Sequence, residues 1–406
     1  MSVIESLSVT ASRARASPSI AASPALVLFM CVFTSQAGIL VLSPILVEVA
    51  RDLDVSTAMA GQLRIFAAPV AAVVAVLITR SAGRLPLRTM LFAGAALVAV
   101  GSLASAASPS FIVLALAQVP LWIGVAALVA AGIGAAGSWS APDERGRLIA
   151  NALAGAPAAW VVGMPVIGLV TETSWRLAFL AVPLPAAILT GVLLVAARGD
   201  RADGAAEASL IRFLREPRAR RWAIAELAAM SSWAGMLVFS GALFIETYGA
   251  SAHLTGLLLA TLAVAFLVGN AIGGRIHSAC MRRTLGRANV VAGVAVAMTW
   301  IVTPNLIVTL VLFSVASVAV AARTVAGTAY GFSVAGRRTL EVGAARAAIT
   351  HVGYLSGSLL GGLALAAGGG TAVGVAFGLL FLASAVPYIS AWRVRCGVSA
   401  VGLSSP

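Results

Sequence analysis

The sequence contains no lysine, and arginine supplies all 27 of its basic side chains. Without lysine the chain has no Walker A phosphate-binding lysine, no Schiff base and no lysine general base. Charged residues of both signs make up only 10% of the 406 residues, whereas a soluble domain carries about 25%. These absences exclude P-loop ATP hydrolysis and an ordinary soluble domain.

Cysteine and histidine are scarce as well, with three of each in the chain. Metal sites and disulfide frameworks need such residues at characteristic, recurring spacings, and no such spacing is present. We therefore expect no metal and no cofactor. The six residues are Cys31, Cys280, Cys396, His253, His277 and His351.

Apolar residues, in contrast, are abundant. They make up 60% of the chain, and the mean hydropathy is +1.02. A membrane-spanning helix needs about 20 mostly apolar residues, so this supply is enough for about twelve spans. The composition excludes a disordered chain and a secreted disulfide scaffold, and it predicts an all-α integral membrane protein.

Apolar runs separated by charged, proline-rich or glycine-rich breakers predict the individual spans. The N-terminal 23 residues are polar and lack a short apolar segment with a cleavage site, so we expect no removable signal peptide. The twelve predicted spans are about 24–46, 58–79, 86–107, 110–137, 148–170, 175–197, 222–245, 254–276, 288–303, 306–331, 347–367 and 370–392.

The arginines predict the orientation of these spans, because positive charge in short loops accumulates on the cytoplasmic side. With the N-terminus inside, 23 arginines fall in inner segments and only two, Arg51 and Arg176, in outer loops. We therefore expect both termini in the cytoplasm and a multi-pass protein of the bacterial inner (plasma) membrane. The charge of +13 then reports orientation, and no nucleic-acid partner is expected.

The longest connection between spans divides the chain into two six-span halves. It holds seven arginines and four acidic residues and has little apolar content. The expected organisation is a cytoplasmic tail 1–23, a six-helix bundle 24–197, a cytoplasmic linker 198–221, a six-helix bundle 222–392 and a cytoplasmic tail 393–406.

An internal repeat supports this division. Residues 37–43 match residues 234–240 at five of seven positions, at an offset of 197 residues. Other glycines and an arginine recur at offsets of 194 or 195. Two parallel six-span repeats place a binding site near the midplane, between the halves. The recurring pairs are Gly61 with Gly256, Arg80 with Arg275, Gly163 with Gly357 and Gly168 with Gly362.

Span 5 carries the most specific local motif. Gly163, Pro165 and Gly168 are followed by Trp175-Arg176 and Phe179. The glycines let helices approach closely, and the proline permits a bend. With the twelve spans and the repeat, this segment resembles the major facilitator superfamily, in its drug–proton antiporter and sugar-efflux (arabinose efflux permease-like) branch.

That resemblance covers residues 24–392 and implies two six-helix pseudo-repeat bundles, transport and no enzymatic activity. It also implies a small-molecule substrate, protons as the coupling ion, membrane lipid around the protein and a monomeric state. The loop of Arg80, Gly83 and Arg84 is similar to the family's cytoplasmic loop motif, but Arg80 stands where an aspartate is expected. The span-4 arginine of drug antiporters has no counterpart here.

Three ionisable residues fall inside predicted spans. Each costs about 2.5–3.5 kcal/mol at a helix centre on insertion scales, so each is a functional candidate. Arg64 either extends to the outer surface or lines the cavity, and Arg323 lies too deep in span 10 to reach water easily. Glu226 falls in the first turn of span 7, where the helix dipole and water would satisfy it. As the only acid within a span, it is also the best candidate for proton coupling.

The resemblance also places spans 1, 4, 7 and 10 around a central cavity. Gln36, Gln118, Trp122 and Trp233 are therefore candidate substrate contacts, with interhelical hydrogen bonding or packing as the alternative. So few charges suit neutral or weakly polar molecules.

We expect a secondary transporter that exports a small organic molecule in exchange for protons. A proton-coupled uptake symporter of the same fold and a non-transporting receptor or scaffold are the alternatives.

Overall fold

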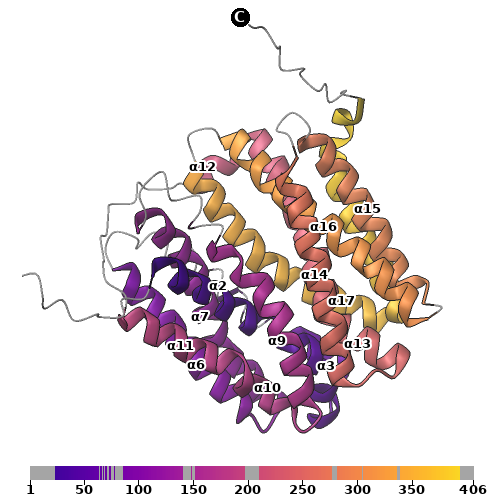
Figure 1. Ribbon diagram of the computed structural model, residues 1–406. Helices are drawn as coiled ribbons and strands as arrows, with labels where there is room; N and C mark the ends of the chain where they lie inside the picture. The colour runs from indigo at the N-terminus through magenta and orange to yellow at the C-terminus, as the bar shows by residue number, and fades with distance from the viewer. Residues whose placement is uncertain are drawn as a thin grey trace, which may run out of the picture.

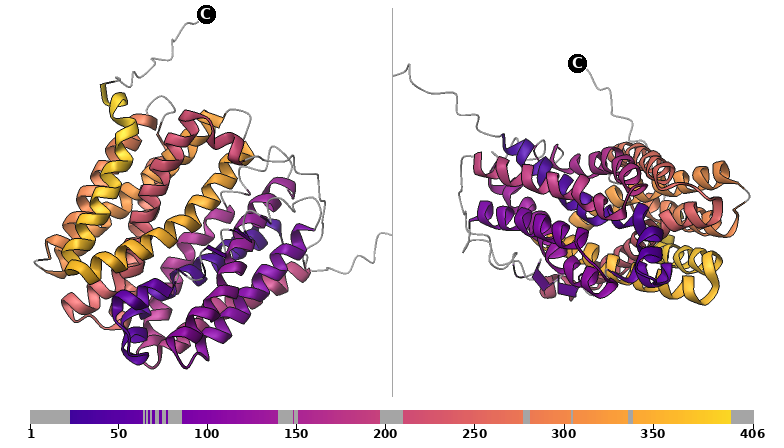
Figure 2. Two further views of the ribbon diagram at one scale, coloured as in Figure 1. Left: turned by 180° about the vertical axis from the view of Figure 1, so that it is seen from behind. Right: turned by 90° about the horizontal axis from the view of Figure 1, so that it is seen from below.

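The computed structural model describes residues 23–63, 86–139, 151–196, 210–276, 281–303, 305–335 and 339–393, with isolated positions between 64 and 85 and at 148. Every regular element within these residues is a helix. Figure 1 shows two groups of neighbouring helices, the indigo-to-magenta first half and the pink-to-yellow second half, and Figure 2 shows them from two further directions. The expected all-α membrane architecture is confirmed.

The first half contains nine of the described elements, several of which join into longer spans. It consists of α2 (Pro24–Leu40), α3 (Leu42–Asp52), α4 (Thr57–Ala60), the 3₁₀ helix η1 (Gly61–Leu63), α6 (Leu87–Ala106), α7 (Phe111–Ser138), α9 (Gly155–Thr171), α10 (Trp175–Ala181) and α11 (Pro183–Ala196).

The second half has longer helices. It follows the short helix α12 (Leu210–Leu214) and consists of α13 (Pro217–Tyr248), α14 (Ala252–Gly274), α15 (Met281–Ile301), α16 (Leu306–Ala335), α17 (Thr339–Ala385) and the 3₁₀ helix η3 (Val386–Arg393).

The number of spans agrees with the prediction. Ten helical stretches of the described residues are long and apolar enough to cross a membrane. The last of them, Glu341–Ile389, contains a break at Gly368 and Gly369, where the backbone is non-helical and Gly369 has φ of +63°. This stretch therefore supplies two predicted spans. The predicted span 58–79 is represented by α4, η1 and isolated positions, so the count is consistent with twelve.

Local sequence explains where several helices begin. Serine side chains at N-cap positions accept hydrogen bonds from backbone N–H groups of the first turn, which would otherwise lack partners. The capping serines are Ser23, Ser56, Ser110, Ser174 and Ser251.

Large apolar side chains such as Ile112, Val195 and Ile307 are 65% to 73% exposed, as expected for surfaces that face lipid.

Several helices extend beyond the predicted spans. Helix α13 begins at Pro217, inside the predicted linker 198–221, and α17 begins at Thr339, eight residues before the predicted span. Phe213 of α12 is fully buried against Trp222 of α13 and Val342 of α17. We call the side of the molecule that holds α12 the linker side, and the opposite side the far side.

Candidate functional site

A buried ion-pair cluster lies between α13, α16 and α17. The Glu226 carboxylate accepts hydrogen bonds from the Arg323 guanidinium through one oxygen and from the Arg346 guanidinium through the other. Glu226 is 1% exposed and Arg323 is 3% exposed. We call Glu226, Arg323 and Arg346 the charged triad.

The triad corrects the expected position of Glu226. Because α13 begins at Pro217, Glu226 lies nine residues along the helix, about 14 Å at 1.5 Å per residue. The helix N-terminus and bulk water therefore do not satisfy this carboxylate. Two arginines do, which is the usual condition for a buried charge in a membrane.

Two glycines of α16 make room for the triad. A Cβ atom at Gly327 would overlap the Glu226 carboxylate, and one at Gly331 would lie 2.6 Å from the Trp222 ring. The Trp222 indole N–H also donates to the Gly327 carbonyl at 2.9 Å. Glycines four residues apart thus let α16 pack directly on Trp222 and Glu226, which are four residues apart on α13.

The triad has more hydrogen-bond donors than acceptors. Two guanidinium groups surround one carboxylate, so its formal charge is +1. Arg323 Nε is buried and has no hydrogen-bond partner among the described residues, and the same is true of the buried Tyr388 hydroxyl. That hydroxyl also lies within electrostatic range of Glu226 and of Arg282 on α15. Positive charge therefore predominates at this place in the second half.

Aromatic side chains connect the two halves near the middle of the helices. The Trp160 ring of α9 lies 5.8 Å from the Phe266 ring of α14, which lies 6.0 Å from the Trp233 ring of α13. The Trp122 ring of α7 meets the Tyr354 ring of α17 edge-on at 5.7 Å. We call these five residues the aromatic interface.

The two candidate glutamines differ in their surroundings. Gln118 is 5% exposed and donates to the Ser105 hydroxyl at 2.9 Å, so it makes a hydrogen bond between α7 and α6 within the first half. Gln36 is half-buried and accepts from the Trp160 indole N–H at 3.4 Å. Gln36 therefore adjoins the aromatic interface, and Gln118 contacts a helix of its own half.

Two of the three repeat-matched glycine pairs lie at the crossings between halves. A Cβ atom at Gly168 of α9 would lie 2.5 Å from the Ala252 carbonyl oxygen and 3.1 Å from the Gly256 Cα atom of α14. A Cβ atom at Gly362 of α17 would lie 2.8 Å from the Gln62 side-chain nitrogen. The repeat relates Gly168 to Gly362 and Gly256 to Gly61, which precedes Gln62. The same close approach therefore occurs twice, once for each copy of the repeat.

Polar contacts between the halves also lie on the far side. The Ser43 hydroxyl of α3 donates to the Leu237 carbonyl of α13, and the Thr57 hydroxyl donates to the Glu246 carboxylate. The contact of Thr57 with Glu246 lies near span ends remote from α12, and that of Ser43 with Leu237 lies between those ends and the middle of the spans. The two halves are therefore joined from their middle to the far side.

The rest of the span-5 motif has a packing role. Gly163 faces Val182, and Pro165 lies within the continuous helix α9. At the end of the motif, Trp175 and Arg176 both donate to the Asp52 carboxylate, at 3.0 and 2.7 Å. The start of α10 is thereby fastened to the end of α3.

Gly357 belongs to a crossing inside the second half, where a Cβ atom would overlap the Ser231 carbonyl and lie 2.6 Å from the Gly235 nitrogen. Arg64, Arg80, Gly83 and Arg84 lie outside the described residues.

Sequence reasoning misses several residues that the structure brings to these places. It places Arg346 in a cytoplasmic segment, because the apolar run begins at residue 347. Phe266 and Tyr354 have no distinguishing signal within strongly apolar spans. Trp160 has one, because it lies in span 5 five residues before the predicted Pro165 bend.

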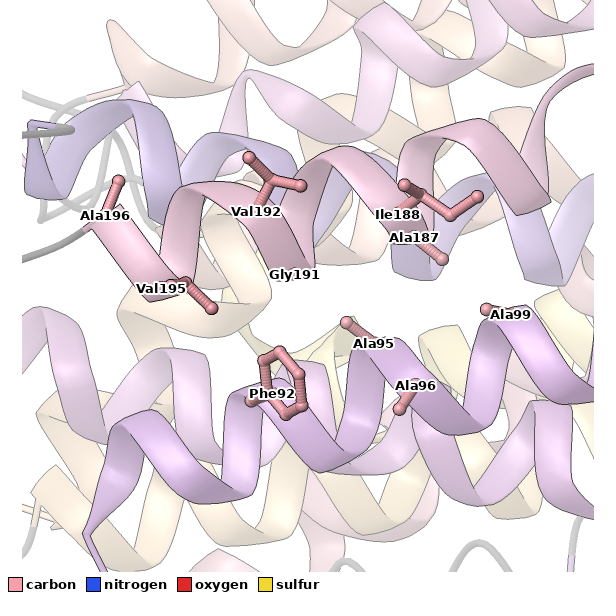
Figure 3. A pocket seen from close by; sticks show the side chains of 10 residues that line it. All are labelled: Phe92, Ala95, Ala96, Ala99, Ala187, Ile188, Gly191, Val192, Val195 and Ala196. Atoms are coloured by element: carbon pink, nitrogen blue, oxygen red, sulfur yellow. The ribbon is translucent and has the colours of Figure 1, made fainter. Parts of the chain in front are cut away.

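Two surface hollows lie away from the charged triad and the aromatic interface. One is a groove between α6 and α11, whose lining side chains are drawn in Figure 3. Its volume is about 540 Å³, and its exposed apolar walls indicate a membrane-facing surface. A second hollow, of about 250 Å³, includes Glu246, Trp300 and Thr371 on the far side. The groove is lined by Phe92, Ala95, Ala96, Ala99, Ala187, Ile188, Gly191, Val192, Val195 and Ala196.

Comparison with known proteins agrees with this architecture. The family model of the Major Facilitator Superfamily matches residues 28–276. A bacterial homolog of the human lysosomal transporter Spinster, solved in an inward-facing and unoccupied conformation, is 16% identical, with a TM-score of 0.71 over 91% of this chain and 94% of that one. A D-xylose–proton symporter is 15% identical, with a TM-score of 0.71 over 90% of this chain and 96% of that one. No curated protein matches the sequence.

Proposed function

Because the chain belongs to the Major Facilitator Superfamily, a family of membrane transporters and not of enzymes, we propose that it is a proton-coupled secondary transporter of a small organic molecule. It works by alternating access, in which the two halves rock about a site between them. The observation that carries this proposal is the uneven contact between the described residues of the two halves. All the contacts named above lie between the aromatic interface and the far side.

This arrangement corresponds to a state that is closed on the far side. Gly168 and Gly256 bring α9 and α14 together there, and Ser43 joins α3 to α13. A transport cycle must separate these crossings and close the linker side instead. The crossings suit this task, because glycine contacts hold helices by packing and leave no charged group exposed when they part.

The aromatic interface is the proposed substrate site. Trp122 and Trp160 come from the first half, and Trp233, Phe266 and Tyr354 come from the second. A molecule held there contacts both halves, which is the condition for binding to bias their relative position. Gln36 adds a polar contact beside Trp160.

Glu226 is the proposed proton site. Its carboxylate is the only acidic group of the triad, and it links three helices of one half. A change in its protonation would change the packing of α13 against α16 and α17. Protonation of a membrane-buried carboxylate is a recognised basis of proton coupling.

The direction of transport has two candidates. The span-5 motif favours export in exchange for protons, because it resembles the antiporter branch of the family. Exchange of a cationic substrate for protons needs an acidic group that is free to bind either one. The Glu226 carboxylate is held by two arginines, so the triad favours uptake together with protons.

Purified protein in liposomes with an imposed pH gradient tests the proposal. A panel of neutral, cationic and anionic organic compounds is offered with the acidic side outside and then inside. We expect at least one compound to move with the proton gradient and to stop when an ionophore collapses it. If no compound moves in either arrangement, the receptor or scaffold alternative replaces the transporter.

The proposed orientation places the linker side in the cytoplasm of a bacterial cell, with both termini on that side. The arginine distribution supports it, since 23 arginines fall in the segments assigned to that side. Reporter fusions after Arg215 and after Pro406 should both report cytoplasm. A periplasmic signal from either fusion contradicts the orientation.

A further inference from the structure

The charged triad has a charge imbalance that its own residues do not correct. Two arginines and one glutamate leave a formal charge of +1 in a place where Glu226 is 1% and Arg323 is 3% exposed. A site with more guanidinium groups than carboxylates attracts anionic ligands, and exchanging one carboxylate for another leaves its net charge unchanged.

Two unused donors lie near the Glu226 carboxylate. Arg323 Nε and the Tyr388 hydroxyl are both buried without a hydrogen-bond partner among the described residues. Tyr388 also packs against Ala225 and Ala326, the neighbours in sequence of Glu226 and Gly327. Several donors therefore lie around one carboxylate, which is the composition of an anion site.

Arg346 gives the triad a route to solvent. Its side chain is 24% exposed, whereas Arg323 and Glu226 are nearly inaccessible. Arg346 lies seven residues from the start of α17, about 10 Å along the helix. An incoming anion would meet Arg346 first.

From these observations we propose that the Arg323–Arg346 pair binds the carboxylate of a small organic anion in place of the Glu226 carboxylate, and that Glu226 then carries a proton. The inference rests on the proposed function and names its substrate class: the triad would hold the carboxylate group, and the aromatic interface the rest of the molecule. A carboxylate is favoured because the guanidinium fork matches two carboxylate oxygens, and Glu226 already occupies both arginines in this way.

Competition of the two carboxylates for the same guanidinium groups gives the exchange its coupling. Before it, two guanidinium groups face one ionised glutamate. After it, the same groups face one bound carboxylate and a neutral glutamate, so the buried charge stays at +1. Binding of the anion favours protonation of Glu226, and protonation favours binding, because such coupling is reciprocal.

The groups around Glu226 fit this scheme. Arg323 of α16 and Arg346 of α17 bind its carboxylate, and Tyr388 of η3 lies within electrostatic range of it. Tyr330 of α16 and Arg282 of α15 lie near Tyr388. None of these groups is a second carboxylate that could take the proton instead. Proton and anion therefore bind together and move in the same direction, which is symport.

Benzoate and its neutral isostere benzamide test the proposal on the purified full chain in detergent. Calorimetry in buffers of different ionisation enthalpy gives both the affinity and the protons taken up. We expect one proton to be taken up per benzoate bound and no comparable binding of benzamide. Over the pH range in which Glu226 is ionised in the free protein, the affinity for benzoate should fall about tenfold for each unit rise in pH. Phosphate and chloride in place of benzoate show whether any anion suffices.

Variants assign the proton to Glu226. Glu226→Gln mimics the protonated glutamate, so we expect benzoate binding without proton uptake and with no dependence on pH. Glu341→Gln, on α17 outside the triad, is the matched control and should behave as wild type. Arg346→Lys keeps the charge but loses the fork, so benzoate should bind at least about tenfold more weakly with proton uptake retained.

Some results overturn the inference. They are an absence of benzoate binding, equal binding of benzamide, wild-type binding without proton uptake, or proton uptake that persists in Glu226→Gln. If Glu226→Gln does not fold, the wild-type proton count and Arg346→Lys still decide the question.

This failure is distinct from failure of the proposed function. Proton-driven flux of neutral compounds without anion binding would overturn only the substrate class. Anion binding with proton uptake but no flux of any compound would overturn the transporter proposal.

Discussion

The two halves of the molecule share their packing but differ in charge. At the repeat offsets of 197, 195 and 194 residues, the triad residues Glu226, Arg323 and Arg346 correspond to Phe29, Leu128 and Ala152 of the first half. Leu128 is fully buried and Ala152 is 7% exposed. Where the second half has two cations and an anion, the first half has three apolar side chains.

This difference separates two kinds of requirement. The glycines that recur in both halves, Gly168 with Gly362 and Gly61 with Gly256, serve helix crossings that the fold needs twice. The triad occurs once, so the fold does not require it. A feature that one copy of a repeat has and the other lacks is the more specific evidence of function.

The largest expected effect comes from removing the anion of the triad. Glu226→Leu leaves the buried Arg323 guanidinium and the partly exposed Arg346 guanidinium without a counter-charge, and breaking a buried pair costs about 3–5 kcal/mol. Phe29→Leu, at the matching position of the first half, should cost about 1 kcal/mol because it changes only apolar volume. Thermal unfolding in detergent measures both. Equal losses would mean that the triad does not differ from ordinary packing.

A double substitution refines this prediction. Glu226→Leu with Arg323→Leu leaves only Arg346, which is partly exposed and can reach water. We expect the double variant to recover most of the stability lost by Glu226→Leu alone, since a buried pair is often replaceable by apolar residues. Additive losses would show that the two side chains are not paired.

An intermediate effect is expected at the crossing between halves. Gly256→Ala places a Cβ atom against the Met164 carbonyl and 3.1 Å from the Met164 carbonyl carbon, and such overpacking costs about 1–3 kcal/mol. The far side should then open more often, which raises the labelling rate of a cysteine introduced there.

Gly274→Ala on the same helix is the control, because no atom lies within 4 Å of its added Cβ. Labelling that rises equally in both variants would mean that the crossing does not hold the halves together.

The smallest effect is expected at a neutral polar contact of the first half. Gln118→Leu removes the hydrogen bond to Ser105, and such bonds between membrane helices average about 0.6 kcal/mol. Stability should fall slightly and proton-driven flux should be unchanged. Gln36→Leu should instead lower flux with little change in stability. The opposite pattern would place the polar substrate contact at Gln118.

Much of the fold is predictable from the sequence, because a span must be apolar over its whole length in lipid. Hydropathy therefore marks the spans, and the repeat offset alone pairs Gly168 with Gly362. The polar ends of helices carry no such signal. Helix α17 begins eight residues before the predicted span, so Arg346 lies within a helix and not in the segment that precedes it.

The triad itself is not predictable from the sequence. Glu226 and Arg323 stand out as single ionisable residues within spans, but their pairing depends on how α13 crosses α16. That crossing depends on Gly327 and Gly331, and nothing in a single helix indicates which neighbour its glycines will face. For the same reason, only two of the five residues of the aromatic interface, Trp122 and Trp233, are expected from the sequence, and their partners are not.

The most direct test compares two transport modes of Glu226→Gln in liposomes, with whichever panel compound shows proton-driven flux. We predict that exchange of labelled for unlabelled compound continues, because a neutral side chain at this position still permits the halves to rock. Accumulation driven by the pH gradient should be lost, while Phe29→Leu keeps both activities. Accumulation at the wild-type level in Glu226→Gln would contradict the account, because protons would then couple elsewhere.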